Sequence, residues 1–274
     1  DAEARDDIQT YLASARVVKQ LPFPKDGFFV PPTVVKVAGI AEMKREIFGP
    51  VLHLATYQAH QLDQVIAEIN NAGYGLTFGL HTRIDSRVQE IVEQVAVGNT
   101  YVNRNQIGAV VGSQPFGGEG MSGTGPKAGG PAYPLRFCTS GDVYADERDM
   151  PGPTGETNRL TRLSRDAFLC LGPGADQIAK QIEAIEAAGG TAQGADGLNA
   201  EALAETQGIA GAVWWGDDAI ARSYLRALAG REGPILPLIT GQPRRFEVTF
   251  ERHLCVDTTA SGGNAELLAE VARA

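Results

Sequence analysis

Two short segments carry residue types that could bind a ligand. The first is Lys44-Arg-Glu-Ile-Phe-Gly-Pro50, in which Glu46 and Phe48 precede a Gly-Pro turn. A carboxylate can accept hydrogen bonds from both hydroxyls of a ribose, and an aromatic ring can pack against a flat heterocycle. On these residues alone, a surface glutamate and a core phenylalanine beside a turn are the simpler interpretation.

The second segment, residues 104–130, has nine glycines and no helical or strand periodicity. Backbone N–H groups exposed by consecutive small residues, as around Gly108 and Ala109, can bind an anion such as a carboxylate. Phe116 would add an apolar wall. A long loop inside a domain is usually functional, although a merely flexible loop is the alternative.

Strands and helices are predicted to alternate around these two segments. The expected strands are 33–37, 51–57, 76–82, 99–103 and 131–139, and the expected helices are 1–20, 62–72 and 85–98. This alternation favours an α/β layer with a largely parallel sheet. The strand at 131–139 could serve as an exposed edge for pairing between subunits.

A Pro- and Gly-rich stretch at 141–163 is predicted to link residues 1–140 to a second, smaller α/β domain at 164–245. The strands expected in that domain are 167–171, 209–215 and 235–239, and the helices are 175–188 and 217–229. Residues 246–274 are predicted to form a terminal hairpin (246–250 with 253–256) and a tail with a helix at 264–273.

The composition of the chain excludes several classes of protein. The chain has 274 residues, a net charge of −9 and 43% hydrophobic residues, which excludes global disorder and disfavours nucleic acid as a partner. No apolar stretch is long enough for a membrane span, and no secretory signal opens the chain. Three scattered cysteines without a CxxC pair predict neither a metal site nor a disulfide framework, and favour a cytoplasmic protein. The missing initiator Met predicts a piece of a longer protein.

The motifs in their order resemble the aldehyde dehydrogenase superfamily. The E-x-F-G-P element is followed by Ala72-Gly-Tyr-Gly-Leu76, by a strand ending in Asn103, and by a P-F-G-G-x-x-x-S-G-x-G loop that starts at Pro115. The Gly-Gly-Pro-x-Tyr at 129–133 is similar to the variant in glutamate-semialdehyde (pyrroline-5-carboxylate) dehydrogenases. Segments 151–158 and 252–264 resemble the C-terminal region of the long bacterial proline utilization A enzymes.

This resemblance implies a role for five residues. Glu46 is expected to bind the nicotinamide-ribose hydroxyls of NAD, and Phe48 to pack against the nicotinamide. Gly108 and Ala109 are expected to hold the α-carboxylate of L-glutamate γ-semialdehyde through their N–H groups, and Phe116 to line the aldehyde tunnel. The tail is expected to fold back and help close the active site.

The family's nucleophilic Cys, general-base Glu and main NAD-binding unit lie upstream of the E-x-F-G-P element, which only 45 residues precede here. We therefore expect no catalytic residue in this chain, and none of Cys138, Cys170 and Cys255 as the nucleophile. The isolated chain is predicted to be inactive. The parent would be a cytoplasmic homo-oligomer, able to associate with the inner face of the membrane, with FAD in an upstream proline dehydrogenase domain.

Two alternatives stay open. The chain could be a non-catalytic lid or oligomerisation module. Residues 165–240 could instead bind a nucleotide at Gly172-Pro-Gly174, which follows a predicted strand and opens a predicted helix. That signal is weak, because the third glycine position of the fingerprint is Gln177. In the long proline utilization enzymes, the corresponding domain is a Rossmann-like relic.

Overall fold

The computed structural model describes residues 1–24, 26–138 and 147–258. The chain forms two compact units, Asp1–Ala72 and a second that begins at Gly73. This boundary does not coincide with the predicted division near residue 140. Each unit has its own sheets, which are described in turn.

The first unit is built on a three-stranded sheet in the order β1-β2-β3. The pair β1–β2 is antiparallel and the pair β2–β3 is parallel. Its elements are α1 (Ala2–Ser14), β1 (Val17–Gln20), β2 (Thr33–Lys36), η1 (Ile40–Glu42), β3 (Val51–Leu54), η2 (Ala59–Gln61) and α2 (Leu62–Asn71). The Asp1 side chain accepts a hydrogen bond from the Ala4 N–H at 2.9 Å and caps α1.

The predicted helix over 1–20 is too long. The backbone is already extended at Ala15, the C-cap of α1, and Val17–Gln20 form β1. The two β-branched residues Val17 and Val18 favour a strand, and Val17 lies opposite Val35 of β2. Tertiary pairing therefore overrides the helical spacing seen in the sequence.

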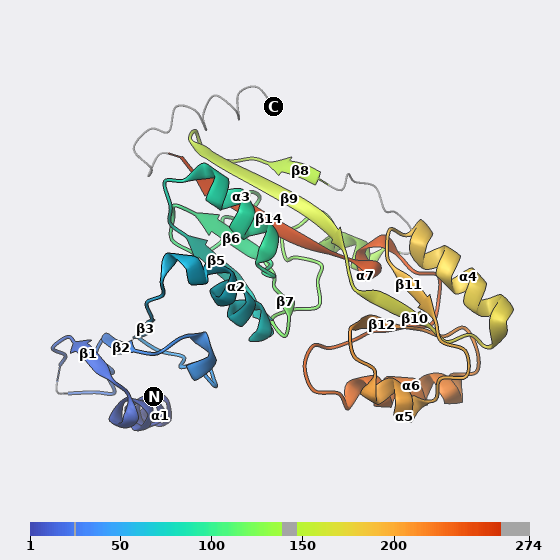
Figure 1. Ribbon diagram of the computed structural model, residues 1–274, viewed down its shortest axis with the longest axis horizontal. Helices are drawn as coiled ribbons and strands as arrows, with labels where there is room; N and C mark the ends of the chain where they lie inside the picture. Colours follow the sequence, from blue (N-terminus) through green and yellow to red (C-terminus); the bar gives the residue numbers. More distant parts are fainter. Residues whose placement is uncertain (25, 139–146, 259–274) are drawn as a thin grey trace. The chain divides into compact units, whose positions relative to one another are not determined.

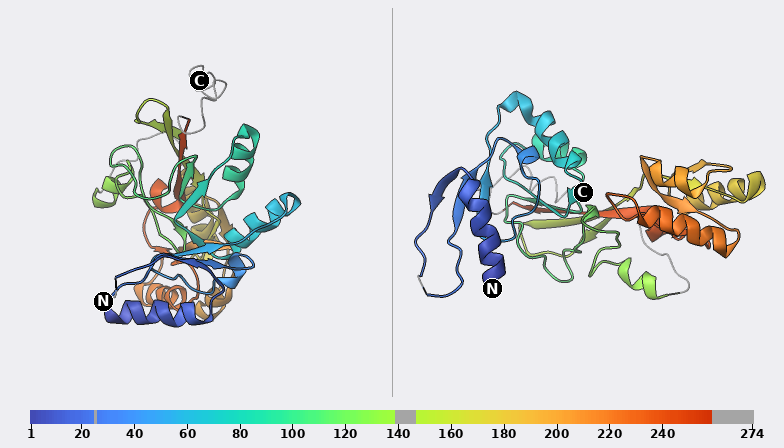
Figure 2. Two further views of the ribbon diagram at one scale, coloured as in Figure 1. Left: turned by 90° about the vertical axis from the view of Figure 1, so that its left-hand side faces the viewer. Right: turned by 90° about the horizontal axis from the view of Figure 1, so that it is seen from below.

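A five-stranded sheet in the order β5-β6-β14-β9-β8 forms the larger sheet of the second unit (Figure 1). Its strands are β5 (Thr77–Leu80), β6 (Asn99–Val102), β8 (Glu147–Met150), β9 (Glu156–Ser164) and β14 (Thr249–Asp257), and α3 (Asp85–Gln94) connects the first two. The strand β14 runs parallel to β6 and antiparallel to β9. Figure 2 shows the two long strands β9 and β14 from two further sides. The last described strand therefore occupies the middle of a sheet that begins at Thr77.

Two predictions fail in this sheet. The stretch 141–163 is not simply a linker, because Glu147–Met150 and most of β9 are paired strands. The hairpin expected at 246–256 is instead the short helix α7 (Arg245–Val248) followed by the single strand β14. In β9 and β14, polar residues that face inward hide the strand pattern in the sequence. The edge strand β8 is exposed over most of its length and so has no buried apolar face to mark it.

The strand expected at 131–139 is also absent from its described part. Tyr133–Phe137 form a 3-10 turn, η3, with Pro134 near its start. Proline has no N–H to donate to a strand ladder. The proposed edge for pairing between subunits is therefore not a strand over 131–138.

The smaller sheet of the second unit is parallel throughout, in the order β11-β10-β12-β13. Its elements are β10 (Ala167–Cys170), α4 (Gly174–Ala187), β11 (Ala192–Gly194), α5 (Ala200–Glu205), β12 (Ile209–Val213), α6 (Asp218–Ala229) and β13 (Leu238–Ile239). One apolar cluster joins Phe168 of β10 to Ile185 of α4, and another joins Leu169 to Leu203 of α5 and Leu228 of α6. Helices thus cover both faces of the sheet, which confirms the predicted α/β class.

Among the described residues, no helix is both long and apolar enough to cross a membrane. The predicted helix at 264–273 lies outside the described residues. The short strands β4 (Tyr74–Gly75) and β7 (Glu119–Gly120) pair with each other and connect the start of the second unit to its glycine-rich segment.

Candidate functional site

The segment with Glu46 and Phe48 lies in the first unit, between η1 and β3. Ile47 points inward, while Glu46 is exposed and the Phe48 ring is 87% exposed. The neighbouring Arg45 makes two hydrogen bonds of 2.9 Å with the Asp7 carboxylate of α1. Glu46 itself has no hydrogen-bond or ion-pair partner among the described residues, so its carboxylate remains available to accept hydrogen bonds.

Gly108 and Ala109 lie in the second unit, in a surface turn of the glycine-rich segment. Gly108 has a φ of 73°, a conformation that L side chains rarely adopt. The flanking side chains of Ile107 and Val111 are 83% and 95% exposed. In the part of the chain that the structure describes, the N–H groups of Gly108 and Ala109 donate to no acceptor. Such free amides can bind an anion.

Phe116 stands where the glycine-rich segment folds back on itself. Its backbone exchanges two hydrogen bonds with Ala128, of 3.0 and 2.8 Å. Its ring is half-buried. The next residue, Gly117, presents a carbonyl oxygen that accepts hydrogen bonds from Asn99 Nδ2 at 3.1 Å and from Lys127 Nζ.

A close backbone approach explains the glycine before β6. A Cβ added at Gly98 would lie 2.0 Å from the carbonyl oxygen of Gly117, and backbone cannot move away as a side chain could. Any larger residue at 98 would therefore push Gly117, and with it Phe116, out of place.

Lys127 carries the strongest electrostatic perturbation in this region. Its side chain is 2% exposed, and its amine donates to Asn99 Oδ1 at 3.2 Å. Burial lowers the pKa of Lys127 to about 8, against the opposing effect of the Glu251 and Glu119 carboxylates. Glu251 also accepts the Lys127 backbone N–H at 3.1 Å. Lys127 thus ties the turn after Phe116 to β6 and β14.

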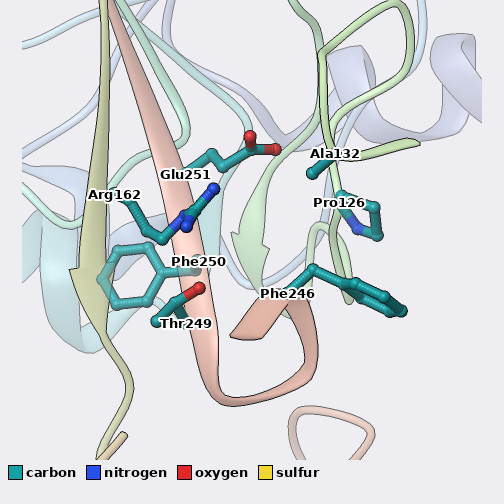
Figure 3. Close-up of a pocket in the computed structure, with 7 residues that line it drawn as sticks. All are labelled: Pro126, Ala132, Arg162, Phe246, Thr249, Phe250 and Glu251. Carbon is teal, nitrogen blue, oxygen red and sulfur yellow. The ribbon is translucent and has the colours of Figure 1, made fainter. Parts of the chain in front are cut away.

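A small pocket lies where the segment around Pro126 faces β9 and β14 (Figure 3). Its wall contains Arg162 of β9, Glu251 of β14, and Ala132 on the opposite side. At the next turn, Arg165 donates to the Thr124 carbonyl at 2.7 Å, and Arg252 makes hydrogen bonds of 2.8 and 3.1 Å with Glu119. The strands after residue 150 therefore hold the glycine-rich segment through charged side chains.

The surroundings of the three cysteines differ in burial. Cys170 and Cys255 are fully buried, and burial raises the pKa of each thiol to about 11, so both stay protonated at neutral pH. Cys138 is exposed, and its Sγ contacts the Pro134 carbonyl oxygen at 3.4 Å. Among the described residues, no base flanks it.

The turn between β10 and α4 is hydrogen-bonded to a side chain of α4. The buried Gln181 accepts the Gly172 N–H at 3.0 Å and donates to the Gly172 carbonyl at 2.7 Å. These contacts engage the Gly172 N–H, from which a phosphate could otherwise accept a hydrogen bond. The nucleotide-binding alternative at 165–240 stays a prediction from the sequence.

Three residues that sequence reasoning missed hold the region together: Lys127, Gln114 and Glu156. Of the predicted site residues, Glu46 and Phe48 are neighbours in the first unit, and the other three lie along one segment of the second. A lysine inside a run of glycine, alanine and proline was the available signal for Lys127. Gln114 and Glu156 carry no such signal, because the contact between them joins residues 42 apart in sequence.

Comparison with known proteins gives a consistent set of matches. Residues 3–141 match the model of the aldehyde dehydrogenase family. The bifunctional protein PutA of Salmonella typhimurium is 33% identical to this chain. The alignment is 357 positions long and covers 98% of this chain and 27% of PutA. A 1-pyrroline-5-carboxylate dehydrogenase of Bacillus cereus is 41% identical over 142 residues, covering 48% of this chain and 27% of that protein.

Among solved structures, proline utilization A (PutA) from Corynebacterium freiburgense shares the fold. It matches with a TM-score of 0.64 at 22% identity, and the match covers 93% of this chain and 31% of that one. The chain thus spans about a third or less of the length of these relatives.

Proposed function

Since half of its length matches that family's model, the chain belongs to the aldehyde dehydrogenase family, and we propose that it is the C-terminal part of a bifunctional proline-catabolic enzyme. The longer chain that contains these residues is called the parent polypeptide below. Its proposed reaction is the NAD-dependent oxidation of L-glutamate γ-semialdehyde to L-glutamate. Relatives named PutA and 1-pyrroline-5-carboxylate dehydrogenase support this choice.

Glu46 and Phe48 are proposed to contact NAD, which would accept the hydride when bound. The supporting observation is that the Glu46 carboxylate is exposed and unpaired among the described residues, since Arg45 is engaged by Asp7. Its two oxygens can accept hydrogen bonds from two ribose hydroxyls. The Phe48 ring, at 87% exposure, offers apolar surface for a flat ring.

Gly108 and Ala109 are proposed to bind the α-carboxylate of the semialdehyde, and Phe116 to line the path of its aldehyde end. The observation that carries this assignment is a pair of N–H groups that donate to no acceptor among residues 1–24, 26–138 and 147–258, in a turn whose Gly108 has a φ of 73°. Two backbone donors converging on a carboxylate make charge-assisted hydrogen bonds. The nucleophilic cysteine is proposed to come from the rest of the parent polypeptide, as is an FAD-dependent proline dehydrogenase.

Glu46→Ala in the parent polypeptide tests the cofactor assignment. We expect the KM for NAD to rise by about tenfold or more, because two charge-assisted hydrogen bonds are lost. The KM for the aldehyde should change little. Lys44→Ala, two residues away and also exposed, is the matched control and should leave both constants unchanged.

The same experiment distinguishes the proposed cofactor-binding role from the alternative of a non-catalytic lid or oligomerisation module. Wild-type kinetics in Glu46→Ala, together with a lost oligomer in size-exclusion chromatography, would support a lid or oligomerisation module instead. Wild-type kinetics with an intact oligomer would show that Glu46 has no part in cofactor binding.

A further inference from the structure

The side chain of Gln114 joins the turn at Gly108 to the strands β9 and β14. Gln114 is 3% exposed. Its Oε1 accepts the Val110 N–H at 3.1 Å, and its own N–H donates to the Val110 carbonyl at 2.9 Å. One residue thus fixes both backbone groups of Val110, which directly follows the proposed carboxylate-binding pair Gly108 and Ala109.

The other end of the Gln114 amide rests on Glu156. The Nε2 atom donates to Glu156 Oε1 at 3.1 Å and lies 3.5 Å from Cys255 Sγ. An ionised carboxylate only accepts hydrogen bonds, so the NH2 group must face Glu156 and the amide oxygen must face Val110. Glu156 therefore sets the orientation of the amide that holds the turn.

Glu156 is itself firmly placed. Its Oε2 lies 2.8 Å from Arg104 Nη1, and the two side chains are only 12% and 16% exposed. Asn158 Nδ2 donates to its Oε1 at 2.8 Å. Removing one partner of an ion pair this enclosed lowers the free energy of unfolding much more than removing one partner of a surface pair.

The two side chains that Gln114 Nε2 contacts, Glu156 and Cys255, come from outside the region that the aldehyde dehydrogenase family model matches. The match ends at residue 141, whereas Glu156 lies on β9 and Cys255 on β14. The turn that bears Gly108 is thus supported by strands that follow the family region and complete its sheet.

We propose that Gln114 and Glu156 are positioning residues that preset the turn at 108–110 for aldehydes bearing a carboxylate. The proposal rests on the proposed function of Gly108 and Ala109. A glycine-containing turn has many conformations, and ordering it on binding costs free energy. By fixing Val110 in advance, Gln114 removes part of that cost for a carboxylate ligand, and leaves an uncharged aldehyde unaffected.

The test is the preference of the parent polypeptide between two aldehydes, L-glutamate γ-semialdehyde and butanal, which lacks the carboxylate. Gln114→Met keeps the length of the side chain and removes the amide. We expect the ratio of the two kcat/KM values to fall by about tenfold or more, through the KM of the semialdehyde. The kcat/KM for butanal should stay within about twofold of wild type.

Glu156→Gln provides a second variant, because it keeps the shape and removes the charge that orients the amide. It should lower the same ratio, so the proposal stays testable if Gln114→Met does not fold. Glu147→Gln, which removes an exposed carboxylate paired with Arg159 on the same sheet, is the control and should keep the wild-type ratio.

An equal loss on both aldehydes would mean that Gln114 and Glu156 act only on folding, and would overturn the proposal. An unchanged ratio in both variants would overturn it as well, while leaving the proposed function standing. A wild-type parent that oxidises butanal but not the semialdehyde would instead remove the proposed function, and this inference with it.

Discussion

Lys127 shows how a single buried charge makes the candidate site sensitive to pH. The amine lies among Asn99, Gly117 and the carboxylates of Glu119 and Glu251, and burial lowers its pKa to about 8 from an ordinary value of 10.5. Between these two pH values the unfolded chain binds a proton that the folded chain has released. The free energy of unfolding therefore rises with pH over that interval and stays low below pH 8.

Lys127→Met should remove this rise, which is on the order of 3 kcal/mol. Urea unfolding of wild type and variant between pH 7 and 11 would give the difference curve. The exposed Lys44→Met serves as the control and should leave the slope unchanged. A slope that survives in Lys127→Met would mean that another group titrates in this range.

His253 of β14 makes the free energy of unfolding sensitive to acidic pH. Its ring is 1% exposed, and neither nitrogen has a well-aligned hydrogen-bond partner among the described residues. Burial, reinforced by the positive charges of Lys127 and Arg104, lowers the pKa of His253 to about 4. Below pH 6.5 the unfolded chain takes up a proton that the folded chain accepts only near pH 4.

The free energy of unfolding should therefore fall as the pH drops from 6.5 to 4, and His253→Gln should flatten that fall. Thermal unfolding across this range would measure it. The exposed His60→Gln should behave like wild type. Identical acid sensitivity in His253→Gln and wild type would contradict the assignment.

At the residue scale, the motifs predict ligand-binding roles for Glu46, Phe48 and Gly108, and these roles stay predictions. All three residues are exposed, as such a role requires. The motifs did not predict what holds those groups. Gln114 and Glu156 are 42 residues apart in sequence and meet only in the folded chain. A pattern within a short window contains no information about such a contact.

At the scale of elements, β14 was the hardest to predict. Along Thr249–Asp257 buried and half-buried residues alternate, but the buried face consists of Thr249, Glu251, His253 and Cys255. Alternation of apolar with polar residues is the signal for a strand, and here polar residues occupy much of the inner face. The helices α4 and α6 were predicted to within a residue or two, because their apolar faces recur at helical spacing.

The central place of β14 predicts that it tolerates no proline. Leu254 pairs with Thr100 of β6 on one side and with Arg159 of β9 on the other. Leu254→Pro should lower the free energy of unfolding by about 3 kcal/mol or more. Arg148→Pro, on the edge strand β8 with one neighbour, should cost clearly less. Urea unfolding of both variants would test this, and equal costs would contradict the sheet order.

The position of β14 also changes how the proposed role of the tail must be tested. A deletion from residue 252 onward would remove most of a central strand and unfold the sheet. Deleting only the residues after Thr258 spares every described strand. The tail after Thr258 lies outside the described residues, and the role expected of it in closing the active site stays a prediction.

At the scale of the whole molecule, the chain combines an aldehyde dehydrogenase region with strands and a parallel sheet that extend beyond it. The fold is shared with a proline utilization A structure over 93% of the chain, and the curated relatives are several times longer. Composition and alternation of elements were enough to predict the α/β class. They were not enough to predict that the stretch after residue 150 returns to complete the sheet of the family region.

The most direct measurement is NADH formation from L-glutamate γ-semialdehyde, made in parallel on the parent polypeptide and on the isolated 274-residue chain. We predict NAD-dependent turnover by the parent and none by the isolated chain, because the nucleophile is proposed to lie elsewhere. Burial keeps the Cys170 and Cys255 thiols protonated, and among the described residues no base flanks Cys138. Turnover by the isolated chain would contradict the assignment of its cysteines, and a parent inactive on this aldehyde would contradict the proposed function.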